Sequence, residues 1–374
     1  MAKHTPPNLF NLEIQRHYLP PPPPGTDHVN PKSLSSLTFV VWDDEDDHVY
    51  AGQFKPDHAR FPDAAKDEWP SPDTLEAIHA AMYKVPDDAL FPKLPDGECV
   101  PTVPDSHAGP DFYTKRPGHL ESLMSHNGDN HLTDTLTIPD LVLHEARMLD
   151  LLSQHSQHPN IVRYHGYRVR RGFITGLVLD MVPGSALTEC MFAGELHKID
   201  KEPFMAALES AVDHLHHVVG IAHNDICPAN VMIRPDGMPC LIDFNSAAKI
   251  GHPKPWACFT LPWHDEKGNQ RISQKRHDLY GLAKLRWLLD HPDKFTDRSI
   301  KPVFPTQIRL EVDPTEPDDP NAETPPSRRG LPDPSCPTLN KMVCISMLSE
   351  TICTSTSSTA RREKKGSSGA RRRR

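Results

Sequence analysis

The sequence predicts an α+β fold in which a small, sheet-rich lobe is followed by a helical lobe. Runs of β-branched and aromatic residues are concentrated before residue 182, whereas amphipathic helical patterns dominate residues 183–290. The 374 residues are enough for both lobes, but 40 prolines and a hydrophobic fraction of 37% indicate that a large part is not packed. We therefore expect a folded unit, at its minimum residues 105–290, with poorly packed terminal segments.

Two β-strands are predicted near the start of the folded part. Residues 37–42 and 48–54 are rich in β-forming residues, and the acidic run 43–47 joins them as a hairpin turn. The run lacks the spacing and the glycine of an EF-hand calcium loop, so a solvated turn is favoured. Residues 74–84 are compatible with a short helix.

Three longer helices are predicted from the spacing of apolar residues. The first covers residues 141–152 with Pro139 at its start, the second residues 202–219 and the third residues 274–289. Between the first two, the apolar run 173–182 predicts a buried strand.

The composition divides the chain into four segments. Residues 1–36, with consecutive prolines at 20–24, are predicted to be a flexible Pro-rich arm. Residues 37–182 form the sheet-rich lobe with an N-terminal extension, and residues 183–290 form the helical lobe. Residues 291–374 read as a mostly disordered tail with a basic end. The arm and the tail are candidate partner-binding segments, although a plain linker and a solvated end are favoured.

Charge and cysteine content restrict the class of protein. A net charge of −9 at pH 7 argues against nucleic acid as the main partner. The eight cysteines form no CxxC pair, and a chain of this length needs no disulfide framework, so a reducing compartment is expected. No segment has the apolar length of a secretion signal or a membrane span. We expect an intracellular protein, cytoplasmic or nuclear, that does not contact a membrane.

The most informative polar residues lie in two adjacent segments, 221–233 and 241–246. They place Asp225, Asn230 and Asp243 between short apolar runs that read as strands. Phosphoryl transfer needs a carboxylate to orient the attacking hydroxyl, and oxygen ligands that hold Mg²⁺ on the nucleotide phosphates. These two carboxylates and the amide supply such a set.

This pattern closely resembles the catalytic and metal-binding loops of the protein kinase family, especially fungal serine/threonine-kinase-like proteins. The resemblance covers roughly residues 111–290 and implies a bilobal fold that binds ATP and Mg²⁺. It makes Asp225 and Asn230 catalytic, and Asn230 and Asp243 metal ligands. The motif His158-Pro-Asn-Ile-Val162 follows the first long helix, as in the family.

The resemblance also implies a nucleotide pocket upstream of the catalytic loop. Glu145 becomes the helix carboxylate, Leu179 guards the back of the adenine pocket, and Asp180 to Val182 form the hinge. Lys115, which ends a β-forming run, is the candidate for the lysine that reaches the phosphates and pairs with the helix glutamate. Lys84 is the alternative, and it lies far upstream.

Several departures from the family pattern accompany this resemblance. No Gly-rich phosphate loop is found in residues 86–110, and Asn245 replaces a glycine, asparagine being one of the few residues that tolerate a left-handed backbone. Asn224 stands where an arginine usually grips an activating phosphate, so control by that phosphorylation is not expected. Cys227 replaces a lysine that is aimed at the transferred phosphate. The sequence also lacks a match for the last helices of the large lobe, so that lobe is predicted to be shortened.

Two further sets of residues have alternative interpretations. Four histidines on and after the second helix invite a zinc site, but no acidic or cysteine partner lies at ligand spacing, so helix-surface histidines are favoured. These are His214, His216, His217 and His223. By resemblance Asp278 anchors the catalytic loop from below; the alternative is a carboxylate that only favours the helix dipole.

Three functions remain open. The first is an active protein serine/threonine kinase acting on a protein substrate, favoured because the base and metal residues are present. The second is a pseudokinase that binds nucleotide or acts as a scaffold, favoured by the absent glycine loop, Cys227 and the short lobe. The third is a small-molecule phosphotransferase of the aminoglycoside- or choline-kinase kind. The identity of the acceptor hydroxyl separates the three.

Overall fold

The computed structural model describes eleven stretches of the chain, and the structural statements below refer to them. They are residues 12–18, 34–43, 46–54, 71–94, 102–104, 109–118, 131–133, 136–254, 260, 262–264 and 270–295. The proline run 20–24 and residues 296–374 of the predicted tail lie outside the described residues. The described part mixes sheets and helices, which confirms the predicted α+β class.

The N-terminal part folds as a four-stranded antiparallel sheet in the order β1-β2-β3-β4. Its strands are β1 (Leu12–Tyr18), β2 (Leu34–Asp43), β3 (His48–Phe54) and β4 (Tyr83–Lys84). The predicted hairpin is therefore confirmed as β2 and β3. The flexible arm is wrong for residues 12–18, because Leu12 and Ile14 pack in a small core with Leu37, Phe39 and Ile78. Cross-strand packing of this kind fixes an edge strand that local composition does not reveal.

The helix predicted at residues 74–84 is present as α1 (Pro72–Ala81). It begins at Ser71, whose side chain accepts a hydrogen bond from the backbone N–H of Thr74 at 3.4 Å. It ends earlier than predicted because the next residues pair with β3 as strand β4. The single-turn helix α2 (Asp87–Leu90) follows.

A second antiparallel sheet, in the order β5-β9-β8, forms the middle of the molecule. It contains β5 (Phe112–Lys115), β8 (Tyr164–Arg170) and β9 (Phe173–Asp180). The buried strand predicted at residues 173–182 is confirmed as β9, with six consecutive buried positions. A small hairpin of β6 (His131–Thr133) and β7 (Leu136–Thr137) precedes the helix that packs against this sheet.

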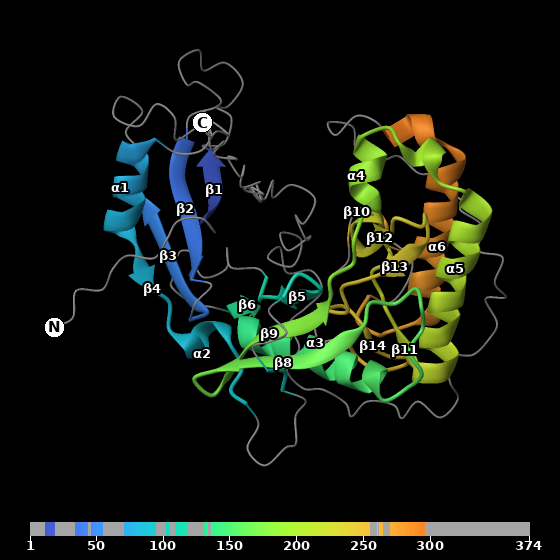
Figure 1. Ribbon diagram of the computed structural model, residues 1–374, viewed down its shortest axis with the longest axis horizontal. Coiled ribbons are helices and arrows are strands. Elements are labelled where there is room, and N and C mark those ends of the chain that lie inside the picture. Colours follow the sequence, from blue (N-terminus) through green and yellow to red (C-terminus); the bar gives the residue numbers. More distant parts are fainter. Residues whose placement is uncertain are drawn as a thin grey trace, which may run out of the picture.

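That helix is α3 (Ile138–Ser153), which confirms the first long helix and extends it at its N-terminus. Thr137 and Asp140 form a capping box, and Pro139 stands in the first turn, so the helix start is strongly specified. Ile138 and Leu141 pack against the N-terminal sheet, while its later apolar residues face the main core. Figure 1 shows α3 and the middle sheet between the N-terminal sheet and the C-terminal helices.

The remaining part is mainly helical. Its helices are α4 (Leu187–Phe192), α5 (Lys201–His214), α6 (Lys275–Asp290), the π-turn η5 (Leu215–Val219) and the 3-10 turns η4 (Leu196–Lys198), η6 (Pro228–Asn230) and η7 (Pro292–Phe295). Its short strands are β10 (Ser185–Ala186), β11 (Ile221–Ala222), β12 (Val231–Ile233), β13 (Pro239–Leu241) and β14 (Ala248–Lys249). The helices predicted at 202–219 and 274–289 are confirmed as α5 with η5 and as α6. None of the described helices combines the length and apolar character needed to cross a membrane.

The acidic turn between β2 and β3 holds the N-terminal sheet against the β8–β9 hairpin. Asp47 is buried, and its carboxylate accepts hydrogen bonds from Arg168 Nε at 2.6 Å and Thr175 Oγ1 at 2.9 Å. Arg171 bridges further to Asp87 with two bonds, at 2.7 and 2.8 Å. The solvated turn that the sequence favours is therefore wrong at Asp47, because a distant hairpin supplies its cationic partner.

Replacing Asp47 with asparagine is expected to lower the free energy of unfolding by about 3 kcal/mol, because Arg168 loses its buried counter-charge. Urea titration would measure this change. The neighbouring Asp46 has a side chain that is 69% exposed, so Asp46→Asn is the matched control and should cost at most about 1 kcal/mol. Equal losses in both variants would contradict a specific role for the buried pair.

Candidate functional site

Three charged side chains from distant parts of the chain meet beside the middle sheet. Lys115 comes from the end of β5, Glu145 from the middle of α3, and Asp243 from the turn after β13. Lys115 Nζ lies 2.6 Å from Glu145 Oε1 and 2.9 Å from Asp243 Oδ1. The backbone N–H of Phe244 also donates to Glu145 Oε1, at 3.1 Å. The alternative lysine, Lys84, lies in β4 of the N-terminal sheet and is exposed.

Burial and mutual attraction together set the protonation of this triad. Burial by itself lowers the pKa of Lys115, but the nearby Asp243 and Glu145 outweigh it, so the pKa is raised and the ammonium stays charged. Burial is the largest influence on Glu145 and raises its pKa. For Asp243, the attraction of Lys115 and two hydrogen bonds overcome burial, so its pKa is lowered. Asp243 is therefore an ionised oxygen donor at neutral pH.

Asp225 and Asn230 lie together on the loop between β11 and β12. Asn230 Nδ2 donates to the backbone oxygen of Asp225 at 2.9 Å and to its Oδ2 at 3.2 Å. Thr260 approaches from the other side, with its N–H 2.8 Å from Asp225 Oδ1 and its Oγ1 3.0 Å from Oδ2. Burial is the main cause of a raised pKa for Asp225. A carboxylate held from two sides in a buried loop is well placed to orient a hydroxyl and to accept its proton.

Two non-glycine residues of this loop region adopt a left-handed backbone. Asn224, directly before Asp225, has φ 64°, and Asp243 has φ 66°. The left-handed backbone that Asn245 would tolerate occurs instead at Asp243. Asp243 Oδ1 accepts a hydrogen bond from the N–H of Asn245 at 3.2 Å, which is the local bond that lets aspartate adopt this conformation.

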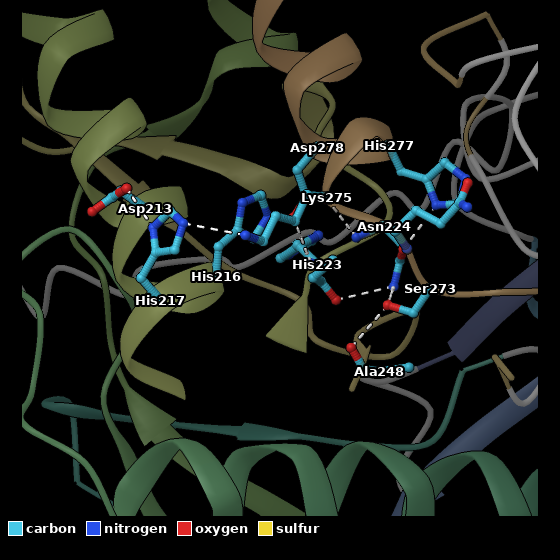
Figure 2. A network of polar contacts seen from close by, with 12 residues as sticks. Asp213, His216, His217, His223, Asn224, Ala248, Ser273, Lys275, His277 and Asp278 are labelled. Atoms are coloured by element: carbon cyan, nitrogen blue, oxygen red, sulfur yellow. Dashed lines mark hydrogen bonds and ion pairs between the residues drawn. The ribbon is translucent and has the colours of Figure 1, made fainter. Parts of the chain in front are cut away.

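A buried carboxylate from α6 holds the backbone of the loop that carries Asp225. Asp278 accepts hydrogen bonds from the backbone N–H groups of His223 at 2.8 Å and Asn224 at 2.6 Å. His216 Nε2 lies 2.8 Å from Asp278 Oδ2 and completes the contact, as Figure 2 shows. Burial alone would raise the pKa of Asp278, but the hydrogen bond and charge of His216 bring it below its usual range. Its contacts with loop amides go beyond an interaction with the helix dipole.

The histidines of this region have structural partners. His216 and His223 are buried, so the surface position predicted for them is wrong. His223 Nε2 donates to the backbone oxygen of Ile242 at 3.0 Å, which joins the Asp225 loop to the residue before Asp243. His217 is on the surface as predicted, 2.7 Å from Asp213. In the described part of the chain, the one group with ligand atoms within 4.8 Å of one another lies elsewhere, at the turn formed by Asp43, Asp46 and His48.

The predicted hinge follows β9. Leu179 is buried opposite Tyr113 of β5, and Asp180 accepts a hydrogen bond from His165 at 2.6 Å. Val182 is half-buried against the main core. Among the described residues, β5 pairs only with β9. The other edge of β5 therefore carries no Gly-rich loop in the part of the chain that the structure describes.

Cys227 is buried beside Asp225. Burial, with the nearby Asp225 charge adding to it, raises the pKa of the thiol well above its usual value. The side chain is therefore a protonated, inert group at neutral pH, in line with the general behaviour of buried cysteines. It supplies no positive charge at the position where the family has a lysine.

Sequence reasoning missed part of the site. Thr260 contacts both carboxylate oxygens of Asp225, and no sequence pattern predicts this contact. Ser273 and His277 were not identified at all, yet both contact the side chain of Asn224. The one sequence signal for this network is the uncharged amide of Asn224 next to Asp225. By the family resemblance, this residue indicates only the loss of an arginine.

Comparisons with known proteins agree with this geometry. Residues 130–282 match the protein kinase domain. The chain is 27% identical over 113 residues to MAP kinase kinase kinase SSK2 of Saccharomyces cerevisiae, covering 30% of this chain and 7% of that protein. It is 26% identical over 153 residues to a mouse protein, "Sperm motility kinase Tcr mutant form", covering 40% and 30%. It is 31% identical over 141 residues to mouse ribosomal protein S6 kinase alpha-4, covering 35% and 18%. The chain thus spans less than a third of the length of these relatives, and Lys115 lies before the matched residues.

Proposed function

Because the chain carries a protein-kinase-like domain, we propose that it transfers the γ-phosphate of ATP to serine or threonine hydroxyls of a protein. The observation that carries the proposal is the meeting of Lys115, Glu145 and Asp243 in one ion-paired group. In the sequence, Glu145 lies 30 positions and Asp243 lies 128 positions from Lys115, so chance is a poor explanation of their meeting. A purely structural role rarely requires two carboxylates and a lysine to meet near a loop that carries another buried carboxylate, here Asp225.

Each residue has a chemical role in this proposal. Bound Mg-ATP supplies the transferable phosphoryl group, and the ammonium of Lys115 contacts its phosphates. Glu145 holds Lys115 in place through the 2.6 Å ion pair. Asp243, with its lowered pKa, and the amide oxygen of Asn230 are hard oxygen donors of the kind that Mg²⁺ prefers. Asp225 orients the acceptor hydroxyl and takes its proton.

The raised pKa of Asp225 suits that last role. A base with a pKa closer to the working pH holds the abstracted proton better than an ordinary surface carboxylate does. The Thr260 bonds fix the direction in which the carboxylate oxygens point. Oδ2 accepts from both Thr260 and Asn230, whereas Oδ1 accepts from Thr260 and keeps a second lone pair for the substrate.

The test is transfer of labelled γ-phosphate from Mg-ATP by the full chain, to itself and to a generic protein substrate. We expect label on serine or threonine, and its loss when EDTA removes the Mg²⁺ on which transfer depends. Label on a small alcohol such as choline or an aminoglycoside, with none on protein, would contradict the protein acceptor.

A second function rests on Cys227. The inert thiol leaves the acceptor side of the site without the cation that the resemblance leads one to expect, so a pseudokinase that binds nucleotide without transferring phosphate is the alternative. Calorimetric binding of ATP to the full chain separates the two. Saturable binding with no transfer to any acceptor would favour the pseudokinase.

A further inference from the structure

The side chain of Asn224 connects four segments around the proposed catalytic loop. Its Nδ2 lies 3.0 Å from Ala222 O, 3.1 Å from Ser246 O and 3.0 Å from Ser273 Oγ. Its Oδ1 accepts from His277 Nδ1 at 2.9 Å and from the N–H of Gln274 at 3.4 Å. Figure 2 shows Asn224 between Ser273 and His277, next to Asp278. One buried amide therefore uses both its donor and its acceptor sides.

The partners of Asn224 lie on the elements that surround both functional carboxylates. Ala222 is three residues before Asp225, and Ser246 is three residues after Asp243. Ser273 Oγ extends the network by donating to Ala248 O at 2.9 Å, on the strand that pairs with Ala222. The loop of Asp225, the turn of Asp243 and the start of α6 are thus joined through one side chain.

We propose that Asn224 is a positioning residue that holds Asp225 and Asp243 in register through the hydrogen bonds of its side-chain amide. This inference rests on the proposed function. Each protein partner of the amide is already in place in the fold, so the network forms on folding. The backbone of Asn224 is left-handed, with φ 64°.

The variants that test the proposal are chosen so that the backbone conformation survives. Aspartate and glycine both tolerate a left-handed φ, so Asn224→Asp removes the two donor hydrogens and Asn224→Gly removes the side chain without backbone strain. The matched control is Asn160→Asp, since Asn160 is a buried asparagine whose Nδ2 donates to Pro239 O at 2.7 Å, away from Asp225.

We expect kcat to fall by roughly tenfold to a hundredfold in both Asn224 variants, as for a displacement of about 1 Å in a reacting group. Calorimetric affinity for ATP without Mg²⁺ should change less than kcat, because Asp243 then binds no metal and the side chain of Asn224 contacts neither Lys115 nor Glu145. Asn160→Asp should retain kcat even if its thermal midpoint falls as far.

The outcomes separate this inference from the proposed function. A wild-type protein that transfers no phosphate overturns both. An active wild-type protein whose Asn224 variants keep full kcat overturns the positioning role alone. If Asn224→Asp does not fold, Asn224→Gly and the milder Ser273→Ala give the same kcat comparison, and full activity in both overturns the proposal.

Discussion

Replacing Asp225 with asparagine is expected to lower phosphoryl transfer by about 10²- to 10⁴-fold, the usual loss when a positioned base is removed. The asparagine side chain has the same shape but cannot take the proton of the acceptor hydroxyl. It also removes a buried negative charge whose pKa burial has raised, so the variant should remain folded. Initial rates with labelled Mg-ATP and a thermal melt measure the two effects.

The control for this prediction is Asp213→Asn. Asp213 has a side chain that is 71% exposed and pairs with the surface residue His217, so the same chemical change there should leave the rate unchanged. The pH profile offers a second check. Asp225 must be ionised to act, so activity is lost as pH falls through its pKa, which lies above the ordinary value of about 4. A wild-type rate that stays constant as the pH falls through the pKa of Asp225 would contradict the assignment of Asp225 as the base.

Replacing Lys115 with methionine is expected to lower the free energy of unfolding by about 4 kcal/mol, because Glu145 and Asp243 lose the cation that they share. Methionine keeps most of the volume and apolar stem of the lysine, so the loss reports on the charge. Urea titration measures it. The variant should also lose nucleotide affinity, since the cation proposed to contact the phosphates is absent.

Lys198→Met is the matched control, since Lys198 forms an ion pair of the same 2.6 Å length with Glu195 on the surface. Both of these side chains are about half exposed, so this surface pair should contribute little to stability. The pH dependence has a definite sign. Without Lys115 the pKa of Glu145 rises further, and protonation relieves the buried charge. The destabilisation should therefore be largest above neutral pH and shrink as the pH falls; a loss independent of pH would contradict this account.

Much of the local structure follows from sequence pattern. The helix α3 could be predicted because its apolar spacing, Pro139 and the flanking Thr137 act within one short segment. The strand β9 and the β2–β3 hairpin were predictable for the same reason. Local sequence pattern is insufficient where contacts with distant segments determine the secondary structure. Residues 12–18 read as part of a flexible arm, and they became a strand because β2 offered them a partner.

The candidate site divides in the same way. The residue types at Asp225, Asn230 and Asp243 could be selected from spacing, since the chemistry of phosphoryl transfer restricts which side chains serve it. The environment of these residues could not be predicted from spacing. Burial of Asp225, the bonds from Thr260 and the cluster around Asn224 depend on segments 22 to 53 residues away in the chain.

The sequence by itself determined the class of fold, the order of the main helices and strands, and the residue types able to do the chemistry. Tertiary structure alone decided that Lys115 rather than Lys84 meets Glu145, that Asp47 is buried against Arg168, and that Asp243 has the left-handed backbone. The physical reason is range. Helix caps and apolar periodicity act over a few residues, whereas charge burial and shared hydrogen bonds arise only when distant segments meet.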